Sequence, residues 1–159
     1  MIYTPPDNIA KRDFLKKSVF LAGSIGGPLN SNSLAENWQK EMGKFFLDLG
    51  YNVFNPRRED YDASWAQEFE NPQFSQQVNW ELNGLKNSDY ILMHFVPGTI
   101  SPISLYEFGR YSTSGKMSVV CPSGFFRKGN VEIGCHADGI PLFDDLAGFK
   151  KHFVNKFHK

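Results

Sequence analysis

The sequence contains few cysteines and lacks any residue spacing that is typical of a metal site. Its two cysteines, Cys121 and Cys135, form neither a closely spaced redox pair nor a pair of metal ligands. We therefore expect two free thiols in a reducing compartment. The four histidines also lack metal-ligand spacing, so we expect neither a metal ion nor another cofactor.

The sequence also lacks an excess of either charge and any long hydrophobic run. Seventeen basic and seventeen acidic residues cancel, whereas proteins that bind nucleic-acid polymers draw affinity from excess positive charge. No apolar run reaches membrane-spanning length, and residues 1–17 lack the apolar core of a signal peptide. We therefore expect a cytoplasmic protein that binds a small molecule rather than nucleic acid or a membrane.

Aromatic side chains, by contrast, are abundant and make up 15% of the 159 residues. They can form the walls of a site for a flat ligand, although filling a core or a subunit interface is their commoner use. The length suits one domain with a substantial core. We expect an N-terminal arm over residues 1–17 and a single α/β domain over residues 18–159.

Alternating strand and helix patterns indicate the fold class. Short apolar runs predict strands over 18–22, 51–54, 89–96 and 117–121. Apolar residues at helical spacing predict helices over 33–50, 74–86, 101–113 and 144–157, with Ser33 and Ser101 as N-caps. In the long loop over 55–72, the spacing of Tyr61, Trp65 and Phe69 permits a short helix. The whole pattern predicts a flavodoxin-like, doubly wound sheet of about five parallel strands with helices on both faces.

Residues suited to binding follow three of the predicted strands. They lie at Gly23-Ser24-Ile25, at Val96–Gly98 leading to Glu107, and at Pro122–Gly124. The carboxyl ends of parallel strands meet at one edge of the sheet, where open α/β folds bind ligands. This pattern predicts the location of a site but not its reaction.

Five segments in a fixed order carry a resemblance to a known family. They are FLAGSI (20–25), NPRR (55–58), QVNWELNGLKNSDYI (77–91), SPISLYEFGRY (101–111) and SVVCPSGFFRKGNV (118–131). In these segments the chain resembles the nucleoside 2-deoxyribosyltransferases and the related nucleotide N-glycosidases. The resemblance implies an enzyme that cleaves the N-glycosidic bond of a 2′-deoxyribonucleoside and transfers the sugar to another base.

The resemblance assigns the family's catalytic carboxylate to Glu107, in the E-x-G motif of Glu107-Phe108-Gly109. Departure of the base generates positive character at C1′, which a carboxylate can stabilise and then trap covalently. The resemblance also places an acid at Glu81, eight residues before Asp89, where it would protonate the leaving base. The alternative for both glutamates is a solvated position on a helix surface, and Asp89 itself has the pattern of a structural residue.

The candidate substrate-binding residues are Gly23, Ser24, Ile25, Ser101, Arg57, Trp65 and Asn130. Ser101 stands where the transferases carry an aspartate beside the sugar 5′-hydroxyl, and where the nucleotide hydrolases carry a serine beside a 5′-phosphate. A hydroxyl at a helix N-terminus favours an anion that a carboxylate would repel. Arg57-Arg58 and Arg127-Lys128 are alternative phosphate ligands, with surface solvation as the simpler interpretation of each pair.

Trp65 is a candidate for stacking on the base, with packing as the alternative. The resemblance implies a homodimer or higher homo-oligomer with shared sites, in which Asn130 completes the site of a neighbouring subunit. Three functions stay open: sugar transfer between bases, hydrolysis of a nucleoside 5′-monophosphate to free base, and nucleotide binding without catalysis. Glu107 and Glu81 argue against the third, whereas base preference and the choice between ribose and deoxyribose stay open.

Overall fold

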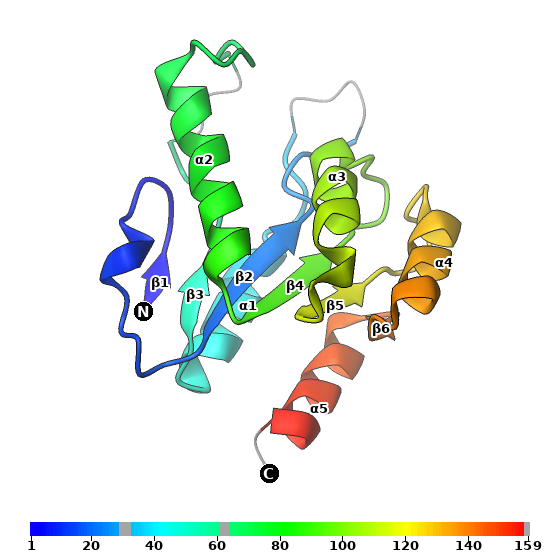
Figure 1. Ribbon diagram of the computed structural model, residues 1–159. Helices are drawn as coiled ribbons and strands as arrows, with labels where there is room; N and C mark the ends of the chain where they lie inside the picture. The colour runs from blue at the N-terminus through cyan, green and yellow to red at the C-terminus, as the bar shows by residue number, and fades with distance from the viewer. Residues whose placement is uncertain (29–32, 61–63, 158–159) are drawn as a thin grey trace. The chain divides into compact units, whose positions relative to one another are not determined.

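The computed structural model describes residues 1–28, 33–60 and 64–157 of the chain. Six strands form one sheet in the order β1-β3-β2-β4-β5-β6 (Figure 1). Their bounds are β1 (Ile2–Tyr3), β2 (Ser18–Gly23), β3 (Asn52–Phe54), β4 (Tyr90–His94), β5 (Met117–Val120) and β6 (Leu142–Phe143). The pairings of β1 and β2 with β3, and of β5 with β6, are parallel. Without the short β1, this is the strand order of the flavodoxin-like fold. The predicted doubly wound fold is confirmed, with six strands rather than about five.

Among the described residues, five α-helices connect or follow the strands. Their bounds are α1 (Trp38–Asp48), α2 (Pro72–Asn87), α3 (Pro102–Tyr111), α4 (Lys128–Asp138) and α5 (Leu146–Phe157), and two 3₁₀ turns are η1 (Ile9–Lys11) and η2 (Ser112–Ser114). The prediction that Ser33 caps the first long helix is wrong, because the Asn37 side chain accepts from Lys40 N–H at 3.2 Å and starts α1. The short helix that the aromatic spacing permitted is absent over 64–70, and its first residue, Tyr61, lies outside the described residues.

The chain divides into two compact units, and the first comprises Met1–Ala22 and Asn37–Ile91. In this unit residues 1–17 do more than form an arm, because Ile2 pairs with Val53 and Tyr3 pairs with Phe54. The Tyr3 and Phe54 rings meet edge to face at 5.9 Å. The Trp80 indole N–H donates to the carbonyl of Asp7 at 2.8 Å, which fixes the same segment to α2.

The second unit comprises Gly23–Glu36 and Leu92–Lys159. In its core Phe95 stacks on Phe125 with ring centroids 4.6 Å apart. Helices α3 and α4 lie side by side (Figure 1), and a Cβ added at Gly134 would stand 3.0 Å from the Phe108 ring. Neither α4 nor β6 was predicted from the sequence, because α4 buries only Val131 and Cys135 and β6 spans two residues.

Both cysteines are free, as predicted, and the structure shows that both are buried. Burial raises the pKa of Cys121 to about 11 and that of Cys135 to about 12, so both thiols are protonated at neutral pH. Within residues 1–28, 33–60 and 64–157, no helix combines the length and the apolar character needed to cross a membrane.

Candidate functional site

Glu107 lies on the inward face of α3. Pro102 occupies the first position of this helix, where the missing N–H of proline is tolerated. Glu107 is 7% exposed and Ser104, three residues earlier on the same face, is 6% exposed. In contrast, Ile103 and Tyr106 are exposed on the other face of the helix. A solvated helix position for Glu107 is therefore wrong, and its side chain is buried.

Three hydroxyl groups meet where β2 and β4 end. Ser24 follows β2, whereas Thr99 and Ser101 lie between β4 and α3. The Ser24 Oγ lies 2.6 Å from Ser101 Oγ and 2.9 Å from Thr99 Oγ1, and the last two atoms are 2.8 Å apart. We call Ser24, Thr99 and Ser101 the hydroxyl cluster. It brings together Ser24 and Ser101, two residues that the sequence analysis predicted for one site.

Backbone groups hold the hydroxyl cluster on both sides. The N–H of Val96 donates to Ser24 Oγ at 2.9 Å, and Thr99 Oγ1 donates to the carbonyl of Val96 at 2.8 Å. The N–H of Ser24 donates to the carbonyl of His94 at 2.9 Å. These bonds tie the end of β2 directly to the segment that follows β4, so the cluster is part of a fixed backbone arrangement.

Gly23 permits this close approach of the two strand ends. Its φ of +135° lies in a region that residues with a side chain rarely adopt. A Cβ added there would stand 2.1 Å from the carbonyl oxygen of His94. Ile25, the third predicted residue of this loop, is half-buried, and its carbonyl accepts from Ala35 N–H at 2.9 Å. The loop after β2 is therefore held at both ends.

Ser101 precedes α3 as predicted, but its side chain does not cap the helix. Its backbone is left-handed, with φ 42° and ψ 56°, and its hydroxyl points to Ser24 and Thr99 instead. Within the described residues, no side chain caps the first turn of α3. The reason is the left-handed backbone, which turns the Ser101 hydroxyl away from the amides of the following residues. The first turn of α3 therefore keeps amide N–H groups that can receive an anion.

Glu81 belongs to the first unit and lies half-buried on α2. The side-chain amide of Gln77 donates to Glu81 Oε1 at 2.7 Å and to the carbonyl of Pro56 at 3.1 Å. Burial raises the pKa of Glu81 to about 7, and the hydrogen bond from Gln77 opposes this rise only in part. A carboxyl group with this pKa is present in both protonation states near neutral pH. It can therefore donate and accept a proton.

The arginines that follow β3 have different partners. Arg57 donates to Gln39 Oε1 at 3.3 Å. Arg58 donates twice to the carboxylate of Asp60, with both distances 2.6 Å. The Arg58 guanidinium also lies 5.3 Å from the centre of the Trp65 ring, so Trp65 packs on Arg58 in this structure. The carboxylate of Asp60 thus balances the charge of Arg58.

Asn130 lies exposed in the first turn of α4. The neighbouring Lys128 donates to the carbonyl of Cys121 at 2.7 Å and to Asp144 at 2.9 Å. These contacts give Lys128 a structural role and weaken the interpretation of Arg127-Lys128 as a phosphate-binding pair. Large apolar side chains are exposed on α3, just before α4 and on α4, namely Ile103, Tyr106, Phe126 and Ile133.

Asp89 has the structural role that its sequence pattern indicated. Its carboxylate accepts from both the N–H and the hydroxyl of Ser18, at 2.9 and 2.8 Å, and from Lys17 Nζ at 3.1 Å. Burial alone would raise the pKa of Asp89, but these hydrogen bonds outweigh it and hold the pKa below its usual value. Asp89 thus fixes the start of β2 to the start of β4.

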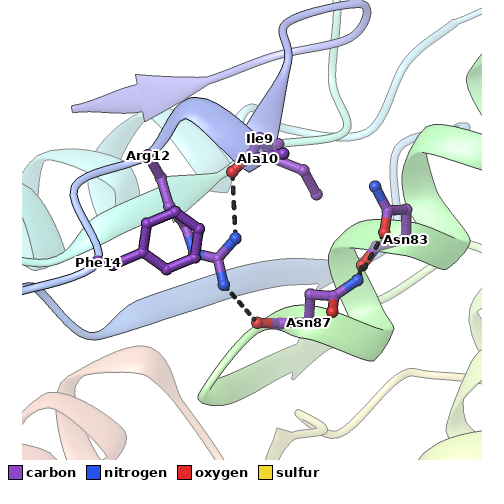
Figure 2. Close-up of a pocket in the computed structure, with 6 residues that line it drawn as sticks. All are labelled: Ile9, Ala10, Arg12, Phe14, Asn83 and Asn87. Atoms are coloured by element: carbon purple, nitrogen blue, oxygen red, sulfur yellow. Dashed lines mark hydrogen bonds between the residues drawn. The ribbon is translucent and has the colours of Figure 1, made fainter.

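A pocket of about 320 Å³ opens elsewhere in the first unit (Figure 2). It is lined by Ile9, Ala10, Arg12, Phe14, Asn83 and Asn87. The Arg12 guanidinium donates to the carbonyl of Ile9 at 3.2 Å and to that of Asn87 at 3.5 Å, so its donors stabilise the backbone. None of the predicted site residues lines this pocket.

The structure ties two further residues to the predicted site, Thr99 and Gln77, which were not predicted from the sequence. A signal existed for each one. Thr99 directly follows Pro97-Gly98 at the end of a predicted strand, and Gln77 precedes Glu81 by one helical turn. Neither position stands out until the partner side chain is placed beside it.

Comparison with family models matches residues 16–125 to the family described as nucleoside 2-deoxyribosyltransferase like. The matched range is more than half of the chain and confirms the resemblance seen in the sequence. It contains Glu81, Glu107 and the hydroxyl cluster, and it ends before Asn130. Among curated proteins, none matches the chain.

Proposed function

Because the chain belongs to the nucleoside 2-deoxyribosyltransferase-like family, we propose that it transfers the sugar of a 2′-deoxyribonucleoside from one base to another. The observation that carries this proposal is the burial of Glu107 on α3. A helix glutamate held inside the protein, within a range matched to this family, is suited to act on a bound substrate. Deoxyribonucleosides supply the C1′ atom on which such a carboxylate acts.

In the proposed reaction Glu107 is the nucleophile. Its carboxylate bonds to C1′ on the face opposite the base while the C1′–N bond breaks, and the bonding electrons leave with the base. A second base then attacks C1′ and displaces Glu107, so two inversions give overall retention. Each step conserves charge, because the carboxylate consumed in the first step is regenerated in the second.

Glu81 is the proposed acid that protonates the departing base. Its pKa of about 7 supports this role, because the protonated form is populated at neutral pH and the deprotonated form can regain a proton from the incoming base. Gln77 donates to the carboxyl group and fixes its orientation. Around the sugar we place Gly23, Ser24, Ile25 and Ser101, and we retain Arg57 and Trp65 as candidate ligands of the substrate.

A second candidate function is the hydrolysis of a nucleoside 5′-monophosphate to free base. One observation favours it: α3 begins without a side-chain cap, next to the hydroxyls of Ser24 and Ser101. Amide groups at a helix N-terminus favour an anion such as a phosphate. In this case water, rather than a second base, would release the sugar from Glu107.

We further infer a homo-oligomer in which Asn130 of one subunit serves the site of another. The exposed Ile103, Tyr106, Phe126 and Ile133 belong to the same unit as Asn130 and would lose contact with water in such an interface. Ile133 alone is 74% exposed in the single chain. Size measurement in solution, before and after Ile133→Asp, tests this arrangement.

Product analysis separates the candidate functions. The protein is incubated with 2′-deoxynucleosides or their 5′-monophosphates, each with and without an acceptor base, and the products are separated by chromatography. A new nucleoside formed only with acceptor supports transfer, whereas free base and sugar phosphate support hydrolysis. Binding without any product supports a nucleotide-binding module and contradicts both enzymatic proposals.

Two variants test the role of Glu107 in the same assay. Glu107→Gln should abolish product formation, whereas Glu70→Gln, which changes an exposed glutamate, should leave it unchanged. Mass measurement of the denatured wild type after incubation without acceptor should show one added deoxyribosyl group. Full activity of Glu107→Gln would contradict the covalent mechanism.

A further inference from the structure

We propose that Thr99 sets the preference of the hydroxyl cluster for the 5′ substituent of the substrate by competing for the protons of Ser24 and Ser101. The inference rests on the proposed function, because it assumes that the cluster contacts the 5′ end of the sugar. Thr99 is 2% exposed and acts through Ser24 and Ser101, so it is a positioning residue.

The cluster has more contacts than hydroxyl protons. Four oxygen–oxygen contacts each need one hydroxyl proton: Thr99 to the Val96 carbonyl, Ser24 to Thr99, Ser24 to Ser101, and Thr99 to Ser101. The three hydroxyl groups supply only three protons. The bond from Val96 N–H to Ser24 Oγ brings its own proton and does not relieve the shortage. At least one contact is therefore always without a proton.

This shortage determines what Ser101 offers to a ligand. When all three protons stay inside the cluster, Ser101 presents oxygen lone pairs and can accept a bond from a 5′-hydroxyl group. A fully ionised phosphate offers only acceptor oxygens, so Ser101 must turn its proton outward to bind it. That rotation leaves two protons for four internal contacts. The cluster therefore lowers the affinity for a phosphate, while the uncapped start of α3 raises it.

Removal of the Thr99 hydroxyl should relieve the shortage of protons that opposes the binding of a phosphate. The loss removes one hydroxyl proton and the three contacts of Thr99, with Ser24, with Ser101 and with the Val96 carbonyl. The shortage of protons is therefore smaller, and Ser24 can donate to Ser101 while Ser101 donates outward. The Val96 carbonyl keeps a partner, because the backbone N–H of residue 99 also donates to it at 3.3 Å. Thr99→Ala should therefore favour the phosphorylated ligand at the expense of the unphosphorylated one.

A purely structural role for Thr99 predicts a different result. Thr99 holds Ser101, whose left-handed backbone is disfavoured for a residue with a side chain. If Thr99 served only to hold this conformation, its loss would weaken the binding of both ligands by a similar factor. The ratio of the two affinities therefore distinguishes the proposal from simple loss of structure.

Calorimetric titration tests the inference with wild type, Thr99→Ala and the matched control Thr99→Ser. Each protein is titrated with a 2′-deoxynucleoside and its 5′-monophosphate, after the best-binding base has been identified with wild type. The affinity ratio of monophosphate to nucleoside should rise about fivefold in Thr99→Ala, since one internal hydrogen bond no longer opposes the phosphate. The ratio should stay unchanged in Thr99→Ser.

An unchanged or lower ratio in Thr99→Ala would overturn the inference. If thermal unfolding shows that this variant does not fold, Thr99→Val provides the same loss of the hydroxyl group with a side chain of similar volume. Failure of wild type to bind any nucleoside or nucleotide would instead refute the proposed function. The two failures are thus distinguishable in one set of titrations.

Discussion

Replacing Glu81 by glutamine tests both the burial of this carboxyl group and its role as an acid. In the folded protein burial raises its pKa from 4.5 to about 7. The folded state therefore binds more protons than the unfolded state between these values, and the free energy of unfolding falls as pH rises through this window. The difference between these two pKa values corresponds to a loss of about 3 kcal/mol above pH 7.

Glu81→Gln removes this loss, because a glutamine carries no charge at any of these pH values and still accepts the bond from Gln77. The variant and wild type should be about equally stable at pH 4, and the variant should be more stable by about 3 kcal/mol at pH 8. Urea unfolding at pH 4, 5, 6, 7 and 8 measures the difference. The matched control Glu70→Gln, at an exposed position, should show no such trend.

The same variant should lose activity although it gains stability. Wild-type turnover should decrease above pH 7 as Glu81 loses its proton, and this decrease should be absent from the residual activity of Glu81→Gln. A stability difference that does not change with pH would refute the argument from burial. A turnover that is unaffected by the substitution would refute the acid role while leaving the burial argument intact.

Four further predictions concern the second unit. Glu107→Ala should fold normally and lose at least about a thousandfold in turnover, as measured by steady-state kinetics. Mixing Glu107→Ala with Asn130→Ala subunits should restore up to about a quarter of wild-type activity if the dimer shares its sites, and no recovery after proven subunit exchange would contradict sharing. Ser101→Asp should make the nucleoside bind better than its 5′-monophosphate in calorimetric titration, because a carboxylate repels the phosphate; an unchanged order would argue against phosphate at this position. Gly23→Ala should lower the free energy of unfolding by more than about 2 kcal/mol, because alanine rarely adopts the positive φ of this position and its Cβ would collide with the His94 carbonyl. Gly109→Ala in α3, where an added Cβ meets nothing, should raise the free energy of unfolding slightly in the same denaturant titration.

The sequence alone determined the central elements of the fold and the family. The strands near 18–22, 51–54, 89–96 and 117–121 were predictable because each is a short and mostly apolar run, which is typical of a buried parallel strand. The helices α2, α3 and α5 were predictable from apolar residues at helical spacing. The order of five short motifs identified the family, because motif order does not depend on knowing any contact.

Elements that tertiary contacts stabilise were not predictable. The two-residue strand β1 exists because Ile2 and Tyr3 pair with β3, and nothing in their local pattern specifies that partner. Helix α4 buries only two residues with small side chains, Val131 and Cys135, so its apolar pattern is weak. The first helix begins at Trp38 rather than Ser33, because Asn37 provides the capping group.

The chemical properties of the candidate site were decided by the tertiary structure. The pKa of Glu81 depends on how deeply α2 is buried, which no spacing of residues specifies. Ser101 could be placed before α3 from the sequence, but its hydroxyl could not be directed to Ser24 and Thr99, since that depends on a left-handed backbone and on contacts between distant segments. Local patterns specify which residues lie at the strand ends, and only the packed chain specifies which of their atoms meet.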